Sequence, residues 1–195
     1  KLLPDRFIPY MKIVVNILEG RPGRASGVKR VFDSSHSHSG RITRLYQRAE
    51  DDFILEKGKR FRDEDLHEDE VTIFETFSNH GYPYADAAFD LQLNRARDSV
   101  NVLWHIDGGP LCEFGEISIS GNQDVSTEFI NKQLSVEPGD TFSRKALDDA
   151  QRRLFSTGLF QIAVVKAPLD EQETSIINIV VEVQEAPRWS TRFGV

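Results

Sequence analysis

The sequence predicts an α+β protein made of two units, each with the order strand–helix–helix–strand–strand and with two helices packed on one face of a three-stranded mixed sheet. Two observations lead to this prediction. A pattern of glycine, phenylalanine and leucine occurs twice, and its glycines, Gly58 and Gly139, lie 81 residues apart. Each copy is followed by two segments in which apolar and polar residues alternate, which is typical of a sheet with one buried and one solvated face.

The repeated pattern marks the beginning of the second helix of each unit. In both copies a phenylalanine follows the glycine by three residues, and a leucine follows the phenylalanine by five. Asp63 and Ser143 are the expected N-caps, because their side-chain oxygens can accept the unpaired amide hydrogens of a first helical turn. Gly81 and Gly158 are expected where each helix ends in a left-handed turn.

Helical spacing predicts one apolar stripe on each of these helices. The stripes consist of Leu66, Ile73, Phe74 and Phe77 in the first unit and of Leu147, Ala150, Leu154 and Phe155 in the second. A shorter helix is expected before each of them, around Ile42–Ala49 and after Ser126, and a strand before that, at Val28–Phe32 and Gly115–Asn122.

The alternating segments predict two further strands in each unit. In the first unit one strand carries Ala87, Phe89, Leu91 and Leu93 on one face, and the next carries Val100, Val102, Trp104 and Ile106. In the second unit the corresponding sets are Phe160, Ile162 and Val164, followed by Ile177, Ile179, Val181 and Val183.

Composition excludes several classes of function. The net charge of −7 argues against nucleic acid as a partner, because phosphate binding needs a clustered excess of Lys and Arg. The single cysteine, Cys112, permits neither a disulfide framework nor a cysteine cluster for zinc, and its apolar neighbours favour an inert side chain. His36 and His38 lie in a polar loop without a third ligand. The sequence therefore predicts no catalytic residues, no metal site and no cofactor.

The order of motifs in the second unit resembles a POTRA domain. The segments that carry the resemblance are Phe114–Asn122, Pro138–Phe142, Leu147–Phe160 and Val181–Glu185. More particularly, the chain is similar to the last two POTRA domains of the BamA/TamA-like outer-membrane assembly (surface antigen) superfamily. Arg188–Val195, with Arg188, Trp189 and Phe193, resembles the start of that family's membrane barrel. This divides the chain into the tail of a preceding POTRA domain (1–22), a POTRA domain (23–110), the membrane-proximal POTRA domain (111–187) and the barrel junction (188–195).

The resemblance implies a non-enzymatic, chaperone-like scaffold in the bacterial periplasm. Its partners would be unfolded outer-membrane proteins, assembly lipoproteins and, through the barrel, the outer membrane. An alternative within the superfamily is a two-partner secretion transporter. An alternative of another class is a periplasmic metal-binding or hydrolase module. Its only support is the loop that contains His36 and His38.

In the resembled fold the last strand of each unit is central, which leaves the strand before it at the edge. An exposed edge can bind an extended chain by strand addition, through backbone hydrogen bonds that are largely indifferent to sequence. The residues expected to form the two client-binding edges are Ala87, Phe89, Asp90, Leu91, Gln92, Leu93, Phe160, Gln161, Ile162 and Val164. Adjacent amides point to opposite sides of a strand. Of Leu91→Pro and Gln92→Pro, one should therefore unfold the unit and the other should abolish only binding, and the sequence does not decide which.

Overall fold

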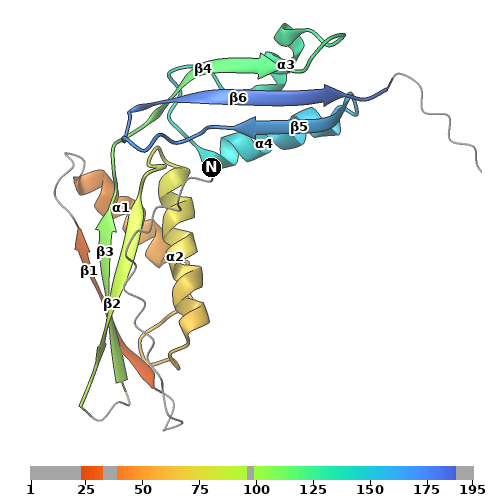
Figure 1. Ribbon diagram of the computed structural model, residues 1–195. Coiled ribbons are helices and arrows are strands. Elements are labelled where there is room, and N and C mark those ends of the chain that lie inside the picture. Colours follow the sequence, from red (N-terminus) through yellow and green to blue (C-terminus); the bar gives the residue numbers. More distant parts are fainter. Residues whose placement is uncertain (1–22, 33–38, 96–98, 188–195) are drawn as a thin grey trace, which may run out of the picture.

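The computed structural model describes residues 23–32, 39–95 and 99–187, and it confirms the predicted α+β class. The first unit contains β1 (Arg24–Phe32), α1 (Ser39–Glu50), α2 (Asp63–Ser78), β2 (Asp86–Leu93) and β3 (Ser99–Asp107) (Figure 1). The second contains β4 (Glu113–Ser120), α3 (Thr127–Leu134), α4 (Arg144–Ser156), β5 (Phe160–Lys166) and β6 (Ile176–Glu185). The expectations about residues 1–22, His36, His38 and 188–195 fall outside the described residues.

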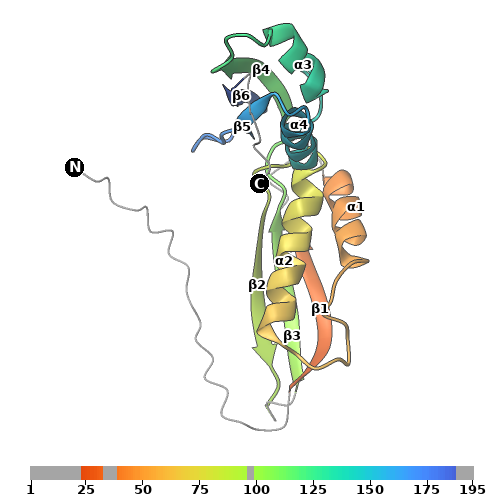
Figure 2. The ribbon, with the colours of Figure 1, turned by 90° about the vertical axis from the view of Figure 1, so that its right-hand side faces the viewer.

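Both units have the same sheet topology. The strand orders are β1-β3-β2 and β4-β6-β5, so the last strand of each unit lies in the centre. That central strand pairs in parallel with the first strand and antiparallel with the middle one. In each unit the two helices lie on one side of the sheet (Figures 1 and 2). The predicted mixed sheet is confirmed, and β2 and β5 are outer strands as expected.

Each unit buries its own hydrophobic core between the sheet and the helices. The first core surrounds Trp104 of β3, which is fully buried, and the second surrounds Ile179 of β6. The predicted inward positions of β3 are buried, namely Val100, Val102, Trp104 and Ile106, and so are those of β6, namely Ile177, Ile179, Val181 and Val183. Burial of large apolar side chains is the main stabilising term of such small units.

One predicted strand face is wrong. Phe160 is buried, but Ile162 is 50% exposed, and the side chains that reach the core further along β5 are Ala163 and Val165. The cause is a shift in register between Phe160 and Ile162, where Gln161 has no partner of its own in β6. An extra residue in one strand reverses the facing of every later side chain. Ile162 and Val164 therefore lie on the face of the sheet away from the helices.

The helix N-termini agree with the prediction in one unit and differ in the other. The hydroxyl oxygens of Ser126 and Ser143 accept hydrogen bonds from Phe129 N and Ala146 N, as expected of N-caps. In contrast, Asp63 is the first residue of α2, and the N-cap position is taken by Arg62 without a side-chain cap. Three acids in the first turn of α2 instead complement the positive end of the helix dipole.

The buried apolar stripes are narrower than predicted. Leu147, Ala150 and Leu154 are buried, whereas Phe155 is 60% exposed. In α2 the side chain of Phe74 is 36% exposed, although Ile73 and Phe77 are buried. Leu93, at the end of β2, is 47% exposed. These three side chains therefore contribute apolar surface to the two units.

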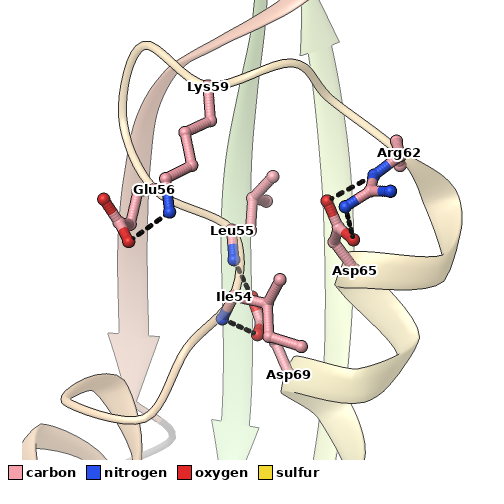
Figure 3. Close-up of polar contacts among 7 residues, drawn as sticks. All are labelled: Ile54, Leu55, Glu56, Lys59, Arg62, Asp65 and Asp69. Carbon is pink, nitrogen blue, oxygen red and sulfur yellow. Dashed lines mark hydrogen bonds and ion pairs between the residues drawn. The ribbon is translucent and has the colours of Figure 1, made fainter.

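A buried acid replaces an apolar residue on the stripe of α2. Asp69 is 1% exposed, and its carboxylate accepts hydrogen bonds from Ile54 N at 2.7 Å and Leu55 N at 3.2 Å (Figure 3). Burial raises the pKa of Asp69, and the two amides act in the opposite direction. One turn earlier, Asp65 is also buried and pairs with Arg62 at 3.0 Å. Asp69 thus fixes the loop that leads into α2.

We expect Asp69→Ala to destabilise the first unit by about 2–3 kcal/mol, because two backbone donors lose their acceptor. The measurement is urea unfolding of the 195-residue chain, with Glu68→Ala as the matched control, since Glu68 is an exposed acid beside it. Equal losses for the two variants would show that the buried carboxylate does not hold the loop.

Candidate functional site: the outer strand edges

The outer edges of β1 and β4 are partly covered by the repeated glycine segment. In the first unit Gly58 N donates to Ala25 O at 2.7 Å, and Phe61 N donates to Gly23 O at 2.9 Å. In the second unit Gly139 N donates to Phe114 O at 2.7 Å, and Phe142 N donates to Cys112 O at 2.9 Å. The repeated pattern therefore has a structural role, since it pairs with the beginning of the first strand of each unit.

The edge of β2 is regular over its whole length. Its eight residues pair with β3 without any shift of register. Asn94 N, just past the strand, donates to Ser99 O at 3.1 Å, which makes Asn94 and Ser99 a hydrogen-bonded pair. Hydrogen-bonded pairs alternate along an antiparallel ladder, so the amide of Gln92 faces β3 and the amide of Leu91 faces outward. The same alternation directs the amides of Phe89 and Ala87 to the outer edge.

The two faces of β2 differ in chemistry. Ala87, Phe89 and Leu91 are half-buried against the first core, and the Phe89 ring stands edge-on to Trp104 with centroids 5.3 Å apart. Asp90 and Gln92 are exposed on the opposite face, where Asp90 Oδ2 lies 3.0 Å from His105 Nε2 of β3. Neither contact crosses the outer edge. Among the described residues, no side chain hydrogen-bonds to the amides of Ala87, Phe89 or Leu91.

A shallow apolar groove adjoins this edge. It has a volume of about 240 Å³ and lies between α2 and the beginning of β2. Val71 and Phe74 of α2, which are 54% and 36% exposed, contribute apolar surface to one wall, and Ala85 and Ala87 contribute to the other. Glu70 and Asp86 also line it and place negative charge at its border. Sequence reasoning assigned Phe74 to the core and so missed the groove.

The two units are joined by direct contacts at the end of α2. Lys145 N, in the first turn of α4, donates to the side-chain oxygen of Asn79 at 2.7 Å, and Cys112 N donates to Gly81 O at 2.7 Å. Gly81 has a φ of 98°, and a Cβ there would lie 2.8 Å from the Thr141 side chain. In both views the beginning of α4 lies next to the end of α2 (Figures 1 and 2). These contacts set the orientation of the second unit.

The described residues contain one cysteine, which is buried. Within them, no group of three or more His, Cys, Asp or Glu side chains could hold a metal ion. Cys112 is fully buried, and desolvation raises the pKa of its thiol to about 11, so the reactive thiolate is scarce at neutral pH. No helix in the described part of the chain has the length and hydrophobicity needed to cross a membrane.

Two small α+β units in tandem, each with an open face and outer strands, define the chain as a pair of modules suited to binding through surfaces. Residues 113–186 match the family model described as POTRA, surface antigen variable number repeat. A putative outer membrane protein assembly factor from Treponema pallidum is 31% identical over 80 residues, which are 40% of this chain. The match spans only 9% of that protein's length.

Solved structures show the same fold across both units. POTRA domains 3–5 of BamA from Haemophilus influenzae superpose with a TM-score of 0.64 at 16% identity, over 84% of this chain and 61% of that one. BamA from Haemophilus ducreyi lacking POTRA domains 1–3 gives 0.67 at 18% identity, over 84% and 29%. Residues 113–186 therefore match a POTRA domain, and the preceding unit has the same fold as the POTRA domains of these BamA structures. POTRA domains of outer-membrane assembly factors are periplasmic parts of outer-membrane proteins.

Proposed function

We propose that the chain is a non-enzymatic scaffold of an outer-membrane protein assembly factor, and that it binds unfolded outer-membrane proteins by strand addition to β2. The observation that carries the proposal is the regular outer edge of β2 beside the groove of α2. We also propose the division of the chain into POTRA domains at 23–110 and 111–187, flanked by 1–22 and by a barrel junction at 188–195. Assembly lipoproteins are further proposed partners.

The outward amides supply the binding energy that does not depend on sequence. An incoming strand that pairs with Ala87, Phe89 and Leu91 would extend the sheet by one strand and bond to donors that now face outward. Transmembrane β-strands share alternating apolar residues but no common sequence. Backbone pairing therefore suits a set of clients that have only this pattern in common.

The groove supplies the preference for apolar side chains. Every second side chain of an added strand points to the helix side of the sheet. There it would meet Phe74 and Val71, whose exposed apolar surface would be covered. Burial of one aromatic or aliphatic side chain contributes about 1.5–3 kcal/mol. The edge and the groove together favour a strand of alternating character over a uniformly polar chain.

We expect Phe74→Asp to weaken binding of a strand-like peptide at least about tenfold, because a charged side chain then lines the groove. The probe is a peptide of about 10 residues with alternating aromatic and polar side chains, the length of a membrane β-strand. The measurement is fluorescence anisotropy with the 195-residue chain. Phe155→Asp is the matched control, since Phe155 is an exposed phenylalanine of α4. Equal weakening by both variants would contradict a specific role of the groove.

A further inference from the structure

The outer edge of β5 differs from that of β2 in one contact. Val165 N donates a hydrogen bond to the side-chain oxygen Oε1 of Gln151 at 3.0 Å. Gln151 lies on α4, so the helix side chain reaches the strand that borders it. Val165 is a core-facing residue of an outer strand, as Leu91 is in the first unit. In the first unit the amides of such residues face the outer edge, and the shared topology places the Val165 amide in the same way.

The position of Gln151 has a counterpart in the first unit. Gln151 precedes the helix-terminating Gly158 by seven residues, and Phe74 precedes Gly81 by the same number. At this position α2 carries Phe74, which lines the groove and has no side-chain acceptor for an amide of β2. In α4 the equivalent residue is Gln151, whose side-chain oxygen accepts the hydrogen bond of Val165 N. A backbone carbonyl of an added strand would otherwise accept that hydrogen bond.

Two other features of β5 act against pairing. The register shift at Gln161 interrupts the regular spacing of the strand, whereas β2 has no such shift. Lys166 ends β5 with an exposed charge, which lies 3.6 Å from Glu182 of β6. Bulges and lysines are devices that protect outer strands from unwanted partners. From the sequence, β2 and β5 were both expected to bind clients. The structure shows that, within the described residues, only β5 has a side-chain hydrogen bond and a register shift at its edge.

We propose that Gln151 closes the β5 edge against strand addition, so that extended clients pair with β2 alone. This rests on the proposed function for the identity of the client, but the hydrogen bond itself can be tested without one. A single side-chain hydrogen bond changes an equilibrium by about fivefold. Gln151 therefore lowers the affinity of the β5 edge for an extended client relative to that of the β2 edge. A client then binds preferentially to the first unit, which has the groove.

The test uses NMR on the 195-residue chain with Gln151→Ala, Gln151→Glu and Gln172→Ala. Gln172 is an exposed glutamine in the loop before β6 and serves as the matched control. Without peptide, we expect the Val165 amide to exchange with solvent about fivefold faster in Gln151→Ala only, since the glutamate variant keeps an acceptor. Unchanged exchange in Gln151→Ala would overturn the proposal.

The second arm adds the strand-like peptide and follows the amide shifts of both edges. We expect shifts at Ala87, Phe89 and Leu91 in every variant, and additional shifts at Ala163 and Val165 only in Gln151→Ala. Peptide pairing with β5 in the wild-type chain would overturn the closure, and so would pairing with β2 but not with β5 in Gln151→Ala. Absence of shifts at β2 in all variants would instead overturn the proposed function, and the exchange rate of Val165 would still decide the role of Gln151.

Discussion

Replacing Leu91 by proline should leave the first unit folded and abolish binding of the strand-like peptide, whereas replacing Gln92 by proline should unfold the unit. The reason is the direction of the two amides. The hydrogen bond from Asn94 N to Ser99 O sets the alternation along β2, so Gln92 donates into the ladder with β3 and Leu91 donates outward. Proline removes a donor and is tolerated only where that donor faces an open edge.

The measurements are circular dichroism for folding and fluorescence anisotropy for binding, both on the 195-residue chain. Leu91→Ala is the control, because it also shortens a half-buried side chain but keeps the amide. We expect it to be folded and to bind the peptide. A folded Leu91→Pro variant that binds as well as the wild-type chain would contradict strand addition at β2. An unfolded Leu91→Pro variant beside a folded Gln92→Pro variant would show that the assigned amide directions are wrong.

Replacing Gly121 by alanine should destabilise the second unit by about 3 kcal/mol or more. Gly121 follows β4 with a φ of 89°, a conformation that costs about 1–2 kcal/mol for a residue with a Cβ. In addition, an added Cβ would lie 1.9 Å from the backbone oxygen of Val183 in β6. A backbone atom in the central strand of a sheet cannot move aside without disturbing the ladder, so the clash adds to the conformational cost.

The matched control is Gly139→Ala, measured by urea unfolding of the same chain. Gly139 has a similar φ of 93°, but no atom lies within 4 Å of the position of an added Cβ. We therefore expect Gly139→Ala to lower the free energy of unfolding only by the conformational cost, about 1–2 kcal/mol. Equal destabilisation by the two alanines would mean that the approach of Gly121 to Val183 is not a constraint on the fold.

The repeat and the alternation of apolar residues were enough to predict both units, and the resemblance to a POTRA domain predicted which strands are outermost. The spacing from Gly58 to Leu66 and from Gly139 to Leu147 placed the second helices correctly, because it reflects one arrangement built twice. The face of β5 was wrong because Phe160, Ile162 and Val164 alternate as regularly as a strand without a bulge does. Only the paired strand shows that Gln161 is an extra residue.

The polar residues that distinguish the two units were harder to predict. Asp69 interrupts the apolar stripe of α2, and this irregularity is a signal for a buried acid with backbone partners. Gln151 gives no such signal, because an exposed glutamine on a helix is ordinary until the neighbouring strand is known. Phe74 fits the spacing of a core residue, and only the placement of α2 beside the beginning of β2 shows that it lines a groove. The roles of Asp69, Gln151 and Phe74 depend on contacts between different helices, strands and loops. The periodicity of one segment does not contain that information.

Amide exchange along β2, with and without the strand-like peptide, tests the central claim most directly. Within this strand the amides of Ala88, Asp90 and Gln92 face β3, and we expect them to exchange slowly in both conditions. The amides of Ala87, Phe89 and Leu91 should exchange fast in the free chain and slowly once the peptide has added a strand. This alternating protection is the result that strand addition predicts. Slowed exchange that is confined to the amides of α2, or is uniform along β2, would contradict it.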